Sequence, residues 1–255
     1  VKIEYKINGV DQEPVVLENE KDNLYRGLLN LQQSAINGDV LEYRIVASDK
    51  SSRENERALP SNGFYKASIF DLRQPVCSYV TDFEYAQSDF SLGDFSISRV
   101  PGFAGSILHT KHPYPSSAIE KEKYNLIAQL KSPVILQEGG EMTFDEVVLV
   151  EPGQKDAAYT EQAFWDYVIV EGSKDNGSTW YPLIQGYDSG NSENWLNSYE
   201  SGKVNGSSGT VGQEGMFLKN TIQLTKPEEF SAGDTVIFRF RLAADEAYNG
   251  WGWAI

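Results

Sequence analysis

Apolar and polar residues alternate along much of the chain, with the period of two that is typical of half-buried β-strands. Near the start, the alternation runs through VKIEYKI at residues 1–7 and recurs at residues 41–47. Asn8-Gly9 follows the first run, and such a pair favours the tight turn of a hairpin. Residues 71–77 (DLRQPVC) then read as a short linker. We therefore expect a small immunoglobulin-like or fibronectin-like β-sandwich over residues 1–72.

Beyond the linker the strand patterns are longer. YNLIAQL at 124–130 and FRFRL at 238–242 alternate, whereas 142–151 and 165–171 are more continuously apolar, as in central strands. About ten such segments favour a larger jelly-roll β-sandwich over residues 78–255. The expected fold class is thus all-β, because the only helical pattern is a short one at Ala118 to Lys123.

The segment from Tyr187 to Gly215 differs from the rest of this region. It is mostly polar, rich in Gly and Ser, and contains Trp195. A long insertion of this kind in a compact domain is usually a functional loop. We expect a loop here, and it is the first place to look for a binding surface.

Composition narrows the function classes. Lys plus Arg number 22 and Asp plus Glu number 37, so the net charge is −15, which disfavours nucleic-acid binding as a main role. Cys77 is the only cysteine, which excludes a disulfide within the chain. No stretch reaches the length of about 18 apolar residues that a membrane span needs. Both ends read as the middle of strands, so we expect a fragment of a longer protein.

Catalytic motifs are missing from the sequence. It has no G-x-S-x-G elbow, no phosphate-binding loop and no dinucleotide-binding glycine pattern. His109 and His112 are the only histidines, and a zinc site would need a third ligand. Asp145, Glu146 and Glu151 surround a buried apolar run, with the wrong spacing for a glycosidase pair. We expect a protein that is not an enzyme, with no catalytic residues.

The most specific string is SKDNGSTW at Ser173–Trp180, which matches the S-x-D-x-G-x-T-W pattern of the Asp-box hairpin. Asp175 and Gly177 suit a tight turn, because Asp accepts hydrogen bonds from nearby backbone and Gly adopts positive φ. A sialidase-type propeller would need several copies at a regular period, and the sequence has one. We interpret the string as a folding element.

Aromatic residues are the remaining candidates for ligand binding. Sugar rings stack on exposed aromatic side chains, and Trp195 and Tyr248 lie in glycine-rich segments. With Trp251 they form a candidate ligand-binding platform. The alternative is that tryptophans fill the core of the larger sandwich, as we expect for Trp253.

The sequence resembles known secreted modules. VKIEYKING and the strand patterns that follow it look like small immunoglobulin-like modules of secreted bacterial proteins. TDFE, LHTKHPY, FWDYVIVEGSKDNGSTWYPL and VIFRFRLAADEAYNGWGWAI are similar to jelly-roll modules attached to metallopeptidases of the immune-inhibitor-A kind. They are also similar to MAM-like domains and to surface proteins of Bacteroidetes-type bacteria.

This resemblance implies a structural calcium ion. Carboxylates at the corresponding places often hold Ca²⁺ in such modules, and the candidate ligands here are Asp82, Glu84 and Asp166. With 37 acidic residues, the alternative is ordinary solvated carboxylates. Asp188, Asn191 and Glu193 are a weaker calcium candidate without the spacing of an EF-hand loop.

The leading functional hypothesis is a non-catalytic, extracellular or cell-surface accessory module pair from a larger protein. Its partners would be neighbouring domains and a glycan or a surface protein, and the acidic charge suits a displayed surface. The first alternative is a carbohydrate-binding module that uses Trp195, Tyr248 and Trp251. The second is a glycoside hydrolase or peptidase without a recognisable motif. Buried tryptophans would favour the accessory module pair, and exposed aromatic side chains would favour the carbohydrate-binding module. A concave site with carboxylates of raised pKa would favour the enzyme.

Overall fold

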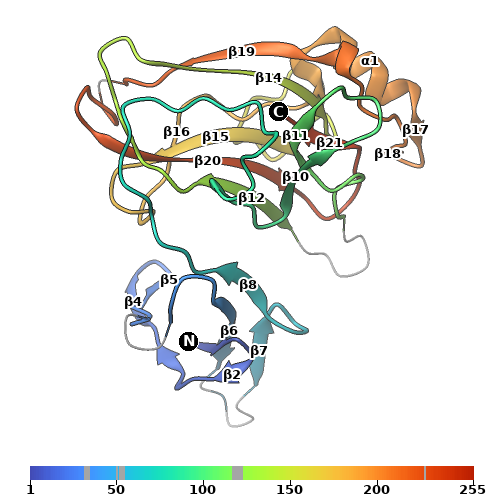
Figure 1. The fold of residues 1–255 in the computed structure, drawn as a ribbon. Helices are drawn as coiled ribbons and strands as arrows, with labels where there is room; N and C mark the ends of the chain where they lie inside the picture. The colour runs from blue at the N-terminus through green and yellow to red at the C-terminus, as the bar shows by residue number, and fades with distance from the viewer. Residues whose placement is uncertain (32–34, 50, 52–54, 117–122, 227) are drawn as a thin grey trace. The chain divides into compact units, whose positions relative to one another are not determined.

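A computed structural model describes the chain except for residues 32–34, 50, 52–54, 117–122 and 227 (Figure 1). The short helix expected at Ala118 to Lys123 falls almost entirely outside the described residues. The chain divides into two compact units, Val1–Asp71 and Leu72–Ile255. No helix among the described residues is long and apolar enough to cross a bilayer.

The first unit is built on one antiparallel sheet. Its strands are β1 (Lys2–Ile7), β2 (Val10–Asp11), β3 (Val15–Val16), β4 (Glu18–Lys21), β5 (Leu24–Arg26), β6 (Val40–Ser48), β7 (Glu56–Leu59) and β8 (Tyr65–Ser68). The sheet order is β2-β1-β6-β7, with β3 paired to β1 and β8 paired to β6, while β4 and β5 form a separate hairpin. Because side chains alternate along β1, Tyr5 and Ile7 share one face and pack with Leu41 as the buried core.

The second unit contains two larger sheets (Figure 1). Its strands are β9 (Phe90–Ser91), β10 (Phe95–Arg99), β11 (Ser106–Thr110), β12 (Tyr124–Leu130), β13 (Val134–Ile135), β14 (Glu141–Leu149), β15 (Tyr167–Ser173), β16 (Tyr181–Pro182), β17 (Lys203–Val204), β18 (Ser207–Ser208), β19 (Leu218–Gln223), β20 (Thr235–Ala244) and β21 (Gly252–Ala254). One sheet has the order β10-β11-β21-β14-β19. The other has the order β16-β15-β20-β12-β9, with β13 paired to β20.

These two sheets pack face to face through apolar side chains. The rings of Phe144 on β14 and Phe240 on β20 lie 5.7 Å apart, and Phe240 lies 5.7 Å from Trp253 on β21. Along β20, every second side chain joins the core, whereas Arg239 and Arg241 lie on the opposite face. The alternation seen in the sequence therefore places this strand correctly, and the predicted all-β class is confirmed.

The polar segment 187–215 is not the loop that the sequence predicted. It contains two 3₁₀ turns, η1 (Ser189–Asn191) and η2 (Glu214–Met216), and the α-helix α1 (Glu193–Ser201). Trp195 and Tyr199 are four positions apart on α1 and both are buried. Two large side chains on one helical face stabilise this short helix by tertiary packing, which overrides the weak helical preference of its polar residues.

Glu146 on β14 is an ionisable side chain in the core, where it is 1% exposed. Its carboxylate accepts hydrogen bonds from the Tyr187 hydroxyl (2.8 Å), the Asn220 amide (2.9 Å) and the Trp253 indole N–H (2.8 Å). Burial raises the pKa of Glu146 to about 7, although the three donors oppose that shift. The charged form of Glu146 is therefore less favoured in the folded protein than in the unfolded chain.

Glu146 should therefore make the stability of the folded protein depend on pH, and Glu146→Gln should remove this contribution. The ordinary pKa of 4.5 applies in the unfolded chain, so the folded state binds the extra proton between pH 4.5 and about 7. The contribution of Glu146 to stability is greatest below pH 4.5, falls as the pH rises to about 7, and is constant above that. Urea unfolding at several pH values should show a smaller decrease in stability over this range in Glu146→Gln than in the unsubstituted protein. Glu138→Gln, at an exposed position, should leave the decrease unchanged. Identical pH profiles for Glu146→Gln and the unsubstituted protein would contradict this assignment.

Candidate metal centre

Three carboxylates meet where strands of both large sheets begin or end. Glu151 follows β14 by two residues, Asp166 directly precedes β15, and Asp245 directly follows β20. Since β15 and β20 are antiparallel neighbours, the start of one lies beside the end of the other. One oxygen from each of the three carboxylates lies within 4.8 Å of the other two. The cluster thus joins β14 of one sheet to β15 and β20 of the other.

The protein holds these carboxylates in place with few, well-defined bonds. The Tyr114 hydroxyl donates to Asp166 Oδ2 (2.5 Å) and accepts from the backbone N–H of Glu151 (3.0 Å). The backbone N–H of Asp245 donates to Asp166 Oδ1 (2.7 Å), and Asp245 Oδ1 accepts from the N–H of Ala247 (2.7 Å). Tyr114 and Asp166 are fully buried, so this arrangement is rigid and shielded from water.

The electrostatics of the cluster are unfavourable as long as only protein groups are counted. Burial, together with the negative charges of Asp166 and Asp245, raises the pKa of Glu151 to about 8. Burial likewise raises the pKa of Asp166 to about 7, against the hydrogen bonds that it accepts. No ion pair joins the three carboxylates to a basic side chain of the described residues. Lys203 attracts Glu151 only from a distance, because its ammonium binds Glu200 (3.0 Å).

One atom in the cluster has no partner at all among the described residues. Glu151 is 5% exposed, and its buried Oε2 atom accepts no hydrogen bond. A buried carboxylate oxygen is costly unless it is hydrogen-bonded or coordinates a metal. The donor set consists of carboxylate oxygens, without His or Cys, which fits a hard cation such as Ca²⁺ better than Zn²⁺. The residues present therefore fit the calcium ion that the sequence led us to expect.

Only one of the three expected metal ligands belongs to this cluster. Asp166 lies in it, whereas Asp82 and Glu84 have other partners. Asp82 Oδ1 accepts from the backbone N–H of Glu84 (3.1 Å). Glu84 pairs with Arg99 (3.2 Å) and accepts from the N–H of Ser106 (3.0 Å). Grouping Asp82 and Glu84 with Asp166 was wrong, because Glu84 instead binds Arg99 on β10 and Ser106 on β11.

Sequence reasoning did not identify Glu151 and Asp245 as candidate ligands. Both lie at the ends of strongly apolar strands, as Asp166 does, and that position is the only local signal they share. Glu151 was assessed only as half of a glycosidase pair. Recognising the trio requires knowing that β14 of one sheet ends beside the start of β15 in the other, which the sequence pattern does not specify.

The three aromatic residues predicted to bind a ligand differ in their exposure to solvent. Trp195 is 1% exposed and donates its indole N–H to the carbonyl of Met216 (2.9 Å), so its expected exposure was wrong. Trp251 is 5% exposed and stacks on His112, with ring centroids 3.7 Å apart. Tyr248 is 44% exposed. A platform of all three is therefore excluded, because helix α1 and the histidine stack bury two of its members.

The histidines and the SKDNGSTW string both have structural partners. His109 and His112 stack on each other at 4.8 Å, and burial lowers the pKa of both below the ordinary value. Asp175 accepts from the N–H of Thr179 (2.8 Å) and from the hydroxyl of Ser173 (2.8 Å), which closes the turn after β15. Each group serves local packing or turn formation.

Comparisons with known proteins add little to this geometry. No protein-family model matches the chain, and no curated protein matches it. A solved structure described as a non-crystalline cellulose specific carbohydrate-binding module, CBM28, is similar over 72% of this chain and 95% of its own. Its sequence identity is 10% and its TM-score 0.39, so this likeness carries no argument about function. The family resemblance drawn from the sequence stays a prediction.

Proposed function

We propose that residues 72–255 form a non-catalytic, calcium-stabilised β-sandwich module of a larger secreted or cell-surface protein. The observation that carries this proposal is the unpartnered Glu151 oxygen, beside two further carboxylates and without a basic side chain bound to them. In this role the module positions neighbouring domains and presents a surface to a glycan or a protein partner. The first unit, residues 1–71, would act as a companion module.

Calcium would act here as a clamp between the two sheets. Asp166 and Asp245 would bind it from one sheet and Glu151 from the other, so the ion would hold the ends of β14, β15 and β20 together. Bound Ca²⁺ would replace repulsion between the carboxylates by attraction to a shared divalent charge. Calcium sites of extracellular modules commonly bind at about 10⁻⁴–10⁻³ M, which suits a protein displayed outside the cell.

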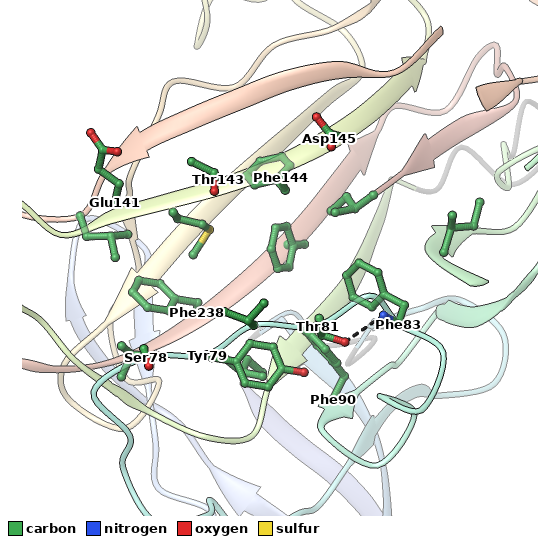
Figure 2. A pocket seen from close by; sticks show the side chains of 18 of the residues that line it. Ser78, Tyr79, Thr81, Phe83, Phe90, Glu141, Thr143, Phe144, Asp145 and Phe238 are labelled. Carbon is green, nitrogen blue, oxygen red and sulfur yellow. Dashed lines mark hydrogen bonds between the residues drawn. The ribbon is translucent and has the colours of Figure 1, made fainter. Parts of the chain in front are cut away.

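Raised carboxylate pKa values also occur in enzyme active sites, so burial is the discriminating property. Asp166 is fully buried and Glu151 is 5% exposed, which leaves little room for a substrate to reach either. The cavity of about 780 Å³ in this unit is lined by other residues (Figure 2). The Tyr114 hydroxyl and the backbone N–H of Asp245 already bind the two oxygens of the Asp166 carboxylate. A structural ion therefore explains these carboxylates better than proton transfer to a substrate does.

The first test is a calcium-dependent melt. All five tryptophans lie between residues 165 and 253, so tryptophan fluorescence reports the unfolding of this unit alone. Calcium at about 100 times its dissociation constant should raise the melting temperature by about 5–10 °C relative to EDTA. Glu151→Gln and Asp245→Asn should each abolish most of this rise, since each removes a charged ligand.

Glu138→Gln is the matched control, because it removes an exposed carboxylate outside the cluster and should keep the full response. If calcium leaves the unsubstituted protein unchanged, or stabilises Glu151→Gln equally, the proposed metal centre is wrong.

A second candidate, glycan binding, is favoured by the outer face of β15 and β20. There Glu171 forms ion pairs with Arg239 (2.7 Å) and Arg241 (2.8 Å). The half-buried Trp180 ring stacks on the Arg239 guanidinium at 4.0 Å, and Tyr167 flanks Arg241 at 5.5 Å. Planar aromatic and charged groups fixed on rigid strands suit the stacking and hydrogen bonding that sugars need.

Affinity electrophoresis in gels that contain soluble glucans, xylans or mannans tests this candidate. We expect a retarding polysaccharide to lose most of its effect on Trp180→Ala, because the stacking surface is removed. Tyr85→Ala, which alters an aromatic side chain that is 92% exposed elsewhere, should remain retarded. Equal retardation of the two variants, or none for the unsubstituted protein with any polysaccharide, would count against glycan binding at this face.

A further inference from the structure

The outer face of one large sheet carries a row of polar side chains that crosses the neighbouring strands β15, β20, β12 and β9. Arg239 on β20 lies opposite Glu171 on β15 and, on its other side, opposite Gln129 on β12. Gln129 in turn lies opposite Ser91 on β9. Because side chains alternate along a strand and Phe240 packs in the core, this row points away from the core. Neighbouring strands are about 4.8 Å apart, so Arg239 and Ser91 are separated by about 10 Å.

The row holds more positive than negative charge. Arg239 Nε–H donates to the Glu171 carboxylate (2.7 Å), and Arg241 donates to the same carboxylate from Nε (2.9 Å) and Nη2 (2.8 Å). Among the described residues, Glu171 is the only carboxylate that forms an ion pair with either arginine. Both guanidinium groups are largely buried, and a buried charge without a counter-ion is unfavourable. The face can therefore accept one further negative charge.

Arg239 is the arginine with unused donors. Its Nη1 and Nη2 groups donate to no described residue, whereas Arg241 Nη1 donates to Asn125 (2.9 Å). Trp180 stacks on the Arg239 guanidinium at 4.0 Å, and Glu171 binds its Nε, so the guanidinium plane is held in place. The free edge of a guanidinium matches the two oxygens of a carboxylate.

The next two side chains of the row are neutral. Gln129 and Ser91 are partly exposed, and their side chains form no hydrogen bond within the described part of the chain. Amide and hydroxyl groups both donate and accept, which suits the hydroxyls of a sugar. The row thus places a carboxylate site at Arg239 beside two sites for hydroxyl groups.

We propose that this row binds a glycan that carries scattered uronic acid residues, with a uronate carboxylate on Arg239 and neighbouring hydroxyls on Gln129 and Ser91. The inference rests on the second candidate function, glycan binding at this face, and specifies the class of glycan. The uronate supplies the negative charge that the two arginines lack. It also uses the Nη donors of Arg239 that no described residue occupies.

The charge of the whole chain restricts the ligand further. With a net charge of −15, the protein repels a dense row of negative charges, as it repels nucleic acid. A mainly neutral glycan with separated carboxylates avoids most of this repulsion. The row contains no apolar side chain, and beyond Arg239 it offers Gln129 and Ser91, which pair with hydroxyls. These properties favour a glycan over an acidic peptide.

The test is affinity electrophoresis of the chain of 255 residues in gels that contain glucuronoxylan, or the same polysaccharide after its carboxyl groups have been reduced to alcohols. Gels without polysaccharide give the reference mobility. The unsubstituted protein should bind glucuronoxylan about tenfold more tightly than the reduced form, because reduction removes the charge-assisted bonds to Arg239. Free glucuronate should compete with glucuronoxylan, whereas glucose at the same concentration should not.

Arg239→Gln should bind both polysaccharides with the weak affinity that the reduced form has for the unsubstituted protein. Glu171 keeps its ion pair with Arg241 in this variant, so the sheet should remain intact. Arg99→Gln is the matched control, because it removes an equal charge at an exposed position on β10 of the other sheet, and it should keep the tenfold preference. Gln129→Ala should weaken binding of both polysaccharides by a similar factor and leave the preference unchanged.

The contrary outcomes separate this inference from glycan binding in general. Equal affinity for the two polysaccharides, or an Arg239→Gln variant that keeps the preference, would overturn the carboxylate site and leave glycan binding intact. Binding to neither polysaccharide would also overturn it, and retardation by a neutral glucan or mannan that Trp180→Ala abolishes would still support glycan binding. If poly-glutamate displaces glucuronoxylan as well as glucuronate does at equal carboxylate concentration, an acidic peptide is the better ligand and the proposal is wrong.

Discussion

The larger unit depends on how it accommodates three negative charges in a place from which water is largely excluded. Carboxylates from both sheets approach within 4.8 Å of one another, and two of the three residues are buried. Since no described basic side chain binds them, either protons or a cation must compensate for the charge. We propose a cation, because it would also bind the free Glu151 oxygen and would link three strand ends. Protonation would leave Tyr114 as a neutral hydrogen-bonded link here, through its bonds to the Asp166 carboxylate and the backbone N–H of Glu151.

Strand β14 connects the main features of this unit. Beyond its last residue lies Glu151 of the candidate metal centre, and farther back along the strand Glu146 binds three donors in the core. Its first half lines a cavity of about 780 Å³. The strand changes environment along its length because β21 covers one edge only from Val147 onward. The proposed ion would anchor the end of β14 that leads to Glu151.

Much of the fold could be predicted, because a period of two is a local property of the sequence. The alternation in FRFRL specifies both the core face and the arginine face of β20. Helix α1 could not be predicted in this way, since Trp195 is buried by distant parts of the chain and not by its polar neighbours in sequence. Of the metal centre, only Asp166 was found. Glu151 and Asp245 could not be found in this way, because their proximity to Asp166 depends on the arrangement of strands that are far apart along the chain.

The most direct test of the central claim is a crystal structure grown with calcium, with diffraction recorded at a wavelength where calcium scatters anomalously. The account predicts one anomalous peak bound by oxygens of Glu151, Asp166 and Asp245, with Glu151 Oε2 among the ligands. Crystals of Glu151→Gln grown under the same conditions should show no peak there. If crystals of the unsubstituted protein show an ordinary water molecule or no density between the three carboxylates, the protein compensates their charge by protonation, and the calcium clamp does not exist.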